Sequence, residues 1–93
     1  MSAKIFPDFL IKSISDSVFE SCNNLIEITL PKNLKVIKDS AFSGCVSLES
    51  IELPQTLEEI GEEAFVRSNL TEIVIPKSVK KMGANVFQFA DEL

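Results

Sequence analysis

Residues 48–65 read LESIELPQTLEEIGEEAF, and the positions of the apolar residues in this stretch recur along the whole chain. The clearest column is aromatic: Phe19, Phe42, Phe65 and Phe87 are separated by 23, 23 and 22 residues. Five residues before each phenylalanine stand Ile14, Ile37, Ile60 and Met82. Internal repeats of this length are typical of solenoid proteins, in which each repeat is one coil of a stack.

The repeat contains two extended segments. In residues 25–30, Ile28 and Leu30 alternate with Glu27 and Thr29. This period of two predicts a short strand with an apolar inner face and a polar outer face. Pro31 ends the strand, because proline cannot donate a hydrogen bond to a neighbouring strand. A second extended piece is predicted at residues 34–37, with equivalents at 57–60 and 79–82.

The segment that follows, residues 39–44, combines acidic and small residues around Ala41 and Phe42. Asp39 has the character of a helix N-cap and Gly44 that of a helix stop. Asp16 and Glu62 occupy the same column as Asp39, which suits acidic groups at the start of a helix. The sequence therefore predicts one short helical turn in each repeat.

A single 23-residue unit cannot bury its own apolar face, whereas stacked units can. We expect like residues to lie above one another at strand spacing, with the phenylalanines as a continuous spine. The predicted fold is one repeat solenoid, 1–93, of parallel short strands and short helical turns, with about three and a half repeats. The repeat units cover roughly 9–24, 25–47, 48–69 and 70–89, and the terminal segments cover 1–8 and 90–93.

Charged residues in two columns support this stacking. One column reads Lys12, Lys35, Glu58, Lys80, and the next reads Val36, Glu59, Lys81. Opposite charges are therefore expected one above another in successive coils. Exposed pairs of this kind contribute about 0.2–1 kcal/mol each, so they adjust the stack and do not hold it together.

Composition excludes several classes of function. The chain has 93 residues, 45% of them hydrophobic, and a net charge of −5. This acidic balance argues against nucleic-acid binding, which needs a basic surface. There is no histidine, and the two cysteines are too few for a thiolate zinc site or a disulfide scaffold. No apolar run approaches the roughly 20 residues of a membrane helix. We predict no enzymatic activity, no cofactor and no metal.

Two strings carry a family resemblance: AFSGCVSL at residues 41–48, and LEEIGEEAF at 57–65 followed by LTEIVIPKSV at 70–79. They resemble the BspA-like leucine-rich repeat, with its A-F-x-x-C-x-x-L-x-x-I-x-I-P pattern. The resemblance covers about residues 10–89. It implies a surface-associated repeat protein that is similar to adhesins and binds other proteins. The absence of a signal peptide predicts a cytoplasmic location instead, and the sequence leaves this choice open.

Two candidate sites have simple structural explanations. Cys22 and Cys45 share a column, three residues after a phenylalanine, which places them within reach of a disulfide but fits small buried thiols better. The acidic cluster of Glu58, Glu59, Glu62 and Glu63 lacks the glycine-containing loop of a calcium site. A solvated surface accounts for it.

The outward-facing residues of the first extended segment are the favoured partner-binding surface. In successive repeats they are Glu27 and Thr29, then Ser50 and Glu52, then Glu72 and Val74. Together they would form a mostly acidic ladder on the sheet face, and solenoids commonly bind protein partners on such a face. The favoured function is thus a protein-interaction module, with adhesion as its specific form.

The ends of the chain suggest an alternative function. Apolar residues stand beside both terminal repeats, namely Phe6, Phe9 and Leu10 at one end and Phe87, Phe89 and Leu93 at the other. A solenoid needs polar caps at its ends. Either the terminal segments cover these residues, with Lys4, Pro7 and Asp8 blunting the first edge, or chains stack end to end. A structural unit that assembles in this way, or a fragment of a longer array, is the second hypothesis.

Overall fold

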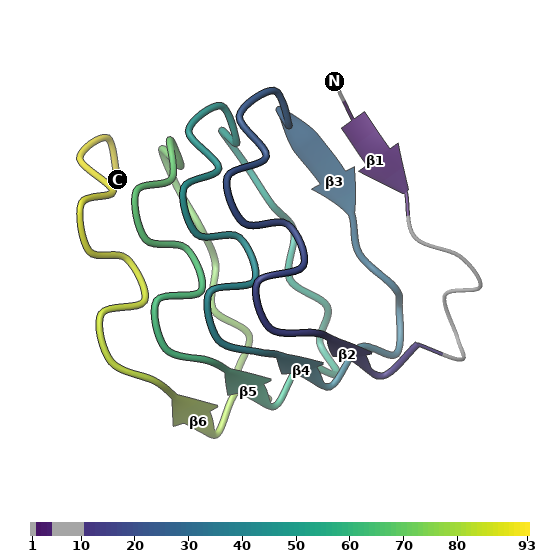
Figure 1. Ribbon diagram of the computed structural model, residues 1–93. Coiled ribbons are helices and arrows are strands. Elements are labelled where there is room, and N and C mark those ends of the chain that lie inside the picture. Colours follow the sequence, from purple (N-terminus) through teal and green to yellow (C-terminus); the bar gives the residue numbers. More distant parts are fainter. Residues whose placement is uncertain (1, 5–10) are drawn as a thin grey trace.

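A computed structural model of the chain describes residues 2–4 and 11–93. Within them the backbone forms successive coils that lie side by side, from β1 at one end to the C-terminus at the other (Figure 1). The described residues contain six short strands: β1 Ser2–Lys4, β2 Ser13–Ile14, β3 Glu27–Thr29, β4 Val36–Ile37, β5 Glu59–Ile60 and β6 Lys81–Met82. The fold is the predicted open solenoid of parallel strands.

One edge of the solenoid is a parallel sheet in the order β2-β4-β5-β6. Ile14 pairs with Ile37, Ile37 with Ile60, and Ile60 with Met82. Backbone bonds along this edge run from one coil to the coil before it, as in those from the Lys35 N–H to the Lys12 carbonyl and from the Gly61 N–H to the Ile37 carbonyl. Equivalent positions of the repeat are therefore neighbours in space, as the columns predicted.

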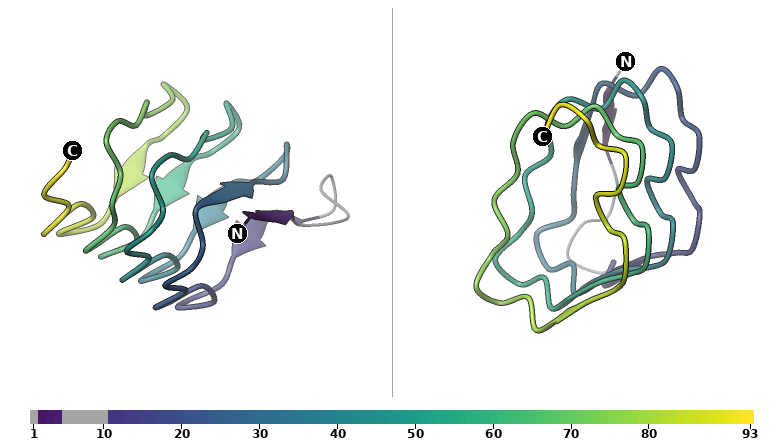
Figure 2. Two further views of the ribbon diagram at one scale, coloured as in Figure 1. Left: turned by 90° about the horizontal axis from the view of Figure 1, so that it is seen from above. Right: turned by 90° about the vertical axis from the view of Figure 1, so that its left-hand side faces the viewer.

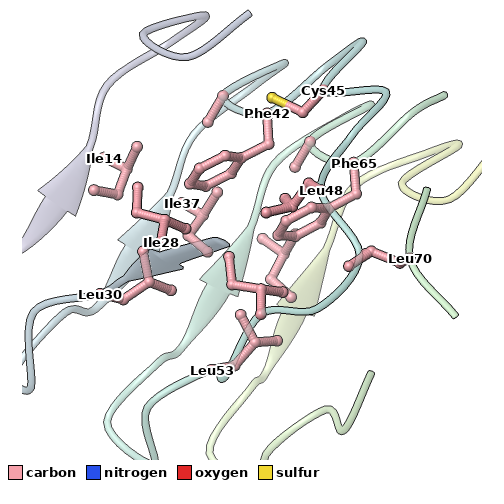
Figure 3. Packing of buried hydrophobic residues seen from close by; sticks show 14 of the residues in the cluster. Ile14, Ile28, Leu30, Ile37, Phe42, Cys45, Leu48, Leu53, Phe65 and Leu70 are labelled. Carbon is pink, nitrogen blue, oxygen red and sulfur yellow. The ribbon is translucent and has the colours of Figure 1, made fainter. Parts of the chain in front are cut away.

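The predicted phenylalanine spine is confirmed. The ring centroids of Phe19 and Phe42 are 5.2 Å apart, those of Phe42 and Phe65 are 5.3 Å apart, and those of Phe65 and Phe87 are 5.9 Å apart. All three pairs are stacked with nearly parallel planes. Figure 3 shows Phe42 and Phe65 among the leucine and isoleucine columns of the core. Phe42 and Phe65 are fully buried, so the spine contributes large apolar surfaces to the core.

The predicted helical turns are wrong: no helix is present in 2–4 or 11–93. Residues 39–44 form successive tight turns, with positive φ angles at Ser40 and Gly44. The Phe42 N–H donates to the Ala64 carbonyl of the next coil at 2.9 Å and not to its own coil. A helix would direct the same group four residues back along the chain. The neighbouring coil supplies an acceptor that a six-residue helix could not match, because short helices are marginal by themselves.

Asp39 is not a helix N-cap, which corrects a second expectation. One of its carboxylate oxygens accepts a hydrogen bond from the backbone N–H of Glu62 in the next coil, at 2.8 Å. Asp16 accepts the N–H of Asp39 in the same way, at 3.1 Å. The acidic column therefore links coils to one another. A carboxylate that accepts a backbone N–H forms a charge-assisted bond, stronger than one between neutral groups.

The coils approach closely at Gly61. A Cβ atom at this position would lie 2.5 Å from both the backbone nitrogen and a carboxylate oxygen of Asp39. These atoms form part of the link between coils, so they cannot move aside without breaking it. Glycine is needed here for the space it leaves.

The opposite side of the solenoid differs from the prediction. We call the extended segments 27–30, 50–53 and 72–75 the open face. They were expected to form a continuous sheet. Only β3 is a strand, and it pairs in parallel with β1, not with the next coil. Within the described chain, no hydrogen bond joins 27–30 to 50–53 or 50–53 to 72–75. The two further views in Figure 2 show the coils from above and from the C-terminal side.

Hydrogen bonds join adjacent coils just before and just after the open face in the sequence. Before it, the Glu49 N–H donates to the Ile26 carbonyl at 3.3 Å, and the Ser47 hydroxyl donates to the Asn23 carbonyl at 2.6 Å. After it, the Thr56 hydroxyl donates to the Lys32 and Leu34 carbonyls. The coils are thus joined at both ends of the open face and unbonded between them.

The first end of the solenoid is described in part. Ser2–Lys4, which lies in the predicted terminal segment 1–8, forms β1 beside β3. The apolar residues Phe6, Phe9 and Leu10, and the predicted edge residues Pro7 and Asp8, lie outside the described residues. Their predicted role therefore stays a prediction.

Candidate partner-binding surface

The side chains predicted to face outward all do so. Ile28 and Ile51 are buried, at 7% and 8% exposed, whereas their neighbours in the chain face solvent. The exposed set contains every predicted residue: Glu27, Thr29, Ser50, Glu52, Glu72 and Val74. Alternation in an extended backbone explains this arrangement, since successive side chains point to opposite sides. The six residues share one face, although four of them do not lie in strands.

Clefts lie between the coils on this face. A cleft of about 430 Å³ runs between 50–55 and 72–74 and is lined by Ser50, Glu52, Glu72 and Val74. A second, of about 350 Å³, lies between 28–32 and 52–54. A third, of about 210 Å³, lies between Glu27–Thr29 and Ser50–Glu52. All three occupy places where adjacent coils are not hydrogen-bonded, and together they involve each of the six predicted residues.

The clefts combine three chemical features. Their lining includes apolar side chains such as Ile28, Leu53 and Ile73, and carboxylates such as Glu52 and Glu72. The backbone of 50–53 and 72–75 has N–H and C=O groups that are not bonded to a neighbouring coil. An apolar surface with nearby polar groups can hold a ligand and fix its orientation. This arrangement is suited to binding a ligand.

Sequence reasoning did not predict that the backbone of 50–53 and 72–75 is unpaired between coils. The L-x-x-I-x-L-P pattern identifies which side chains face outward, and it is the same in a paired and an unpaired segment. The strand β1 was also missed, because Ser2-Ala3-Lys4 lacks the isoleucine of the column in which it lies. No other sequence signal marks either feature.

The cysteines are free thiols, and Cys45 is fully buried. Its Sγ atom donates to the Phe19 carbonyl oxygen at 3.1 Å. Burial raises the pKa of the Cys45 thiol from 9.0 to about 11, and a backbone hydrogen bond from Cys22 opposes this rise in part. A raised pKa reduces the thiolate fraction at neutral pH, so Cys45 is a packing residue, as the structural interpretation predicted.

The charge columns are confirmed in part. Lys35 and Glu58 form an ion pair at 3.4 Å, as expected from their column. In the described part of the chain, Glu58 and Lys80 form no ion pair within 4.0 Å, and neither do Glu59 and Lys81. In the acidic cluster, Glu58 and Glu62 are exposed, and Glu59 and Glu63 are half-buried. No group of three or more potential metal ligands comes together among the residues the structure describes.

The C-terminal coil exposes apolar residues that are buried in earlier coils. Met82 is 44% exposed and Ile75 is 36% exposed, while Phe89 and Leu93 are also exposed. The Arg67 guanidinium lies 5.1 Å from the centre of the Phe89 ring, in the coil before it. Across 2–4 and 11–93 there is no helix with the length and apolar character needed to cross a membrane.

The fold and the surface can be compared with known proteins. A leucine-rich repeat protein from Bacteroides ovatus matches with a TM-score of 0.93 and 38% identity, over 100% of this chain and 24% of that one. The Treponema pallidum leucine-rich repeat protein TpLRR matches with a TM-score of 0.76 and 29% identity, over 88% of this chain and 50% of that one. A leucine-rich repeat protein from Eubacterium ventriosum matches with a TM-score of 0.71 and 26% identity, over 99% and 30%.

This chain spans half the length or less of each of these solved structures. No curated protein matches it. The family model of the BspA type leucine-rich repeat region, with six copies, matches residues 5–93. Repeats of this kind are generally non-enzymatic modules that mediate protein interactions or serve as structural units. The periodic columns, the stacked phenylalanines and the match over nearly the whole sequence lead to one conclusion: the chain belongs to the BspA-type leucine-rich repeat family.

Proposed function

We propose that this chain is a non-enzymatic protein-interaction module that binds its partner through the open face. The observation that carries the proposal is that the six predicted residues are exposed on one side and line clefts between coils. The coils behind this face are fixed by the phenylalanine spine and by cross-coil hydrogen bonds. A rigid support lowers the entropic cost of binding, because the surface loses little freedom when a partner docks.

Adhesion is the specific form of this function that we favour. The family resemblance motivates it, and it would place the module at a cell surface. Glu27, Glu52 and Glu72 give the face a negative charge, which favours a partner with a basic surface. The proposed role is therefore recognition through shape and charge.

The test is a charge reversal on a partner isolated by pull-down and then purified. The variant Glu27→Lys/Glu52→Lys/Glu72→Lys should weaken binding at least tenfold, and the loss should shrink as salt rises. The control variant Glu20→Lys/Glu62→Lys/Glu92→Lys changes the net charge equally at exposed positions away from this face. It should bind like the unmodified chain. Equal weakening by both variants, or by neither, would contradict the choice of surface.

A second candidate function is end-to-end assembly, and the exposed apolar residues of the C-terminal coil favour it. Met82 and Ile75 occupy columns that are buried wherever another coil follows. Contact between the last coil of one chain and the first coil of another would cover them. Lys80 and Lys12 share a column, so this contact would bring like charges together and should strengthen with salt. Light scattering over a series of concentrations and salt conditions tests this function, and a constant monomer mass would contradict it.

A further inference from the structure

The open face offers a main chain as well as side chains, and this feature identifies a class of ligand. We infer that the cleft between 50–53 and 72–75 binds an extended segment of the partner, rich in lysine or arginine, by β-strand addition. The inference rests on the proposed interaction function and specifies the chemistry of the same surface. In strand addition, backbone hydrogen bonds supply affinity and alternate side chains supply specificity.

The first step of the argument is the unpaired backbone. Residues 50–53 are extended, as the alternation of buried Ile51 and Leu53 with exposed Ser50 and Glu52 shows. Their N–H and C=O groups form no hydrogen bond with 27–30 or with 72–75. An unpaired extended segment is a template for pairing with another chain. The volume of about 430 Å³ between 50–55 and 72–74 lies directly beside this segment.

The second step is a precedent within the same molecule. Ser2–Lys4 pairs in parallel with Glu27–Thr29, with Ser2 opposite Glu27, Ala3 opposite Ile28 and Lys4 opposite Thr29. Glu27–Thr29 is the equivalent of Ser50–Glu52 one repeat earlier. The structure therefore already contains one extended segment seated against this column of the repeat. That segment reads Ser-Ala-Lys, a sequence with small residues and a positive charge.

The third step is charge and polarity. The carboxylates of Glu52 and Glu72 line the cleft from opposite coils, and Ile73 and Val74 add apolar surface. An extended peptide presents alternate residues to opposite sides. A peptide in which lysine alternates with an aliphatic residue can therefore direct its charges toward the carboxylates and its apolar side chains toward the coils. This complementarity selects a basic occupant over an acidic one.

The experiment uses the full chain and three peptides with blocked termini. The probe is Lys-Val-Lys-Val-Lys-Val-Lys. The second peptide has the same sequence with N-methyl groups on alternate residues, which remove the backbone donors of one edge and keep the charge. The third replaces each lysine with glutamate. Binding is followed by two-dimensional NMR of the labelled chain, and hydrogen exchange reports protection at each amide.

The expected result is saturable binding of the probe with a dissociation constant at or below about 1 mM. Shift changes and slowed exchange should concentrate at the amides of residues 50–53 and 72–75. N-methylation should weaken binding at least tenfold, and the glutamate peptide should not bind. The variant Glu52→Lys/Glu72→Lys should also lose at least tenfold. Glu20→Lys/Glu62→Lys, with the same charge change on other surfaces, should bind like the unmodified chain.

Other outcomes overturn the inference in distinguishable ways. Equal binding of the plain and N-methylated peptides would mean that charge alone holds the ligand and that no strand is added. Protection confined to β6 would place strand addition at the end of the sheet and not at the open face. An absence of saturation up to about 1 mM probe would also reject strand addition. The proposed function would survive these results if the purified partner still responded to the charge reversal at Glu27, Glu52 and Glu72. It would fail together with this inference if that partner did not respond.

Discussion

The coil of residues 48–69 and the coil of residues 70–89 have nearly the same sequence pattern and very different burial. Ile60 is fully buried, whereas its equivalent Met82 is 44% exposed. Leu53 is 5% exposed and its equivalent Ile75 is 36% exposed. The inner coil has neighbours on both sides, and the described C-terminal coil has one. Burial in this molecule therefore depends on position in the stack. An apolar side chain in the terminal coil contributes less to stability than its equivalent in an inner coil.

The largest expected effect compares the aromatic spine at the two positions. Phe42 is stacked between Phe19 and Phe65, so Phe42→Ala should lower the free energy of unfolding by about 3–5 kcal/mol. Phe87 stacks on Phe65 alone and is half-buried, so Phe87→Ala should cost about 1–2 kcal/mol. Chemical denaturation monitored by circular dichroism measures both values. Equal losses of stability in the two variants would contradict the difference between inner and terminal coils.

The second effect depends on pH and concerns Cys45. Its pKa in the folded chain is raised to about 11 from 9.0, so the unfolded chain loses this proton first as pH rises. The contribution to stability is complete below pH 9 and is lost between pH 9 and 11. It amounts to about 2–3 kcal/mol for a difference of this size.

The Cys45→Ala variant separates this titration from all others. Denaturation at pH 8 and pH 11 should show a smaller alkaline loss in Cys45→Ala than in the unmodified chain. Cys22 lies in the first described coil and is less buried. The control Cys22→Ala should keep most of the alkaline loss, because burial is the main cause of the raised pKa, and an unchanged loss in Cys45→Ala would contradict the assignment.

The third effect concerns the two glycines in equivalent positions. Gly61→Ala brings a methyl group against the backbone of Asp39, and the next coil prevents residue 61 from moving away. We expect a loss of about 1–3 kcal/mol. Gly83→Ala makes the same close approach to Glu62, but its coil has no described neighbour beyond it and can shift outward. A loss below about 1 kcal/mol is expected there. Thermal unfolding of the two variants would show whether freedom at the end of the stack relieves the overlap.

The smallest effect is a gain in stability. Glu63 has a φ of 57°, a conformation that costs a residue with a side chain about 1–2 kcal/mol and costs glycine nothing in steric terms. Glu63→Gly should therefore stabilise the inner coil by about 0.5–1 kcal/mol after the entropic cost of glycine. The terminal equivalent, Asn85, tolerates this conformation better, so Asn85→Gly should gain less. As a control, Glu59→Gly in β5 should destabilise, and a gain there would mean that the backbone angle is not the cause.

The repeat columns were sufficient to predict the order and register of the coils. Residues spaced by 23 must superpose if each coil is to bury its apolar face, and Ile14, Ile37 and Ile60 do so. The exposure of Glu27 and Glu52 followed from the alternation of extended chain. These predictions depend only on which residues are equivalent and which are apolar.

The path of the hydrogen bonds could not be predicted in the same way. The Phe42 N–H had two candidate acceptors, one in a helix of its own coil and one in the next coil, and the sequence contains suitable residues for both. The stack decides the outcome, because it places the Ala64 carbonyl 2.9 Å away. The separation of 50–53 from 72–75 is likewise a result of how whole coils are spaced. The candidate site was therefore predictable as a set of side chains and unpredictable as a set of unpaired backbone edges.

The cross-coil contacts that join residues 23 apart have an evolutionary consequence. The hydrogen bonds that the Asp16 and Asp39 carboxylates accept each join residues 23 apart, as does the ion pair of Lys35 with Glu58. A duplication or deletion of 23 codons inside the gene leaves every remaining coil with a partner of the kind it had before. Unequal recombination can thus add or remove whole coils without requiring a new core. Each added coil adds one more cleft to the open face.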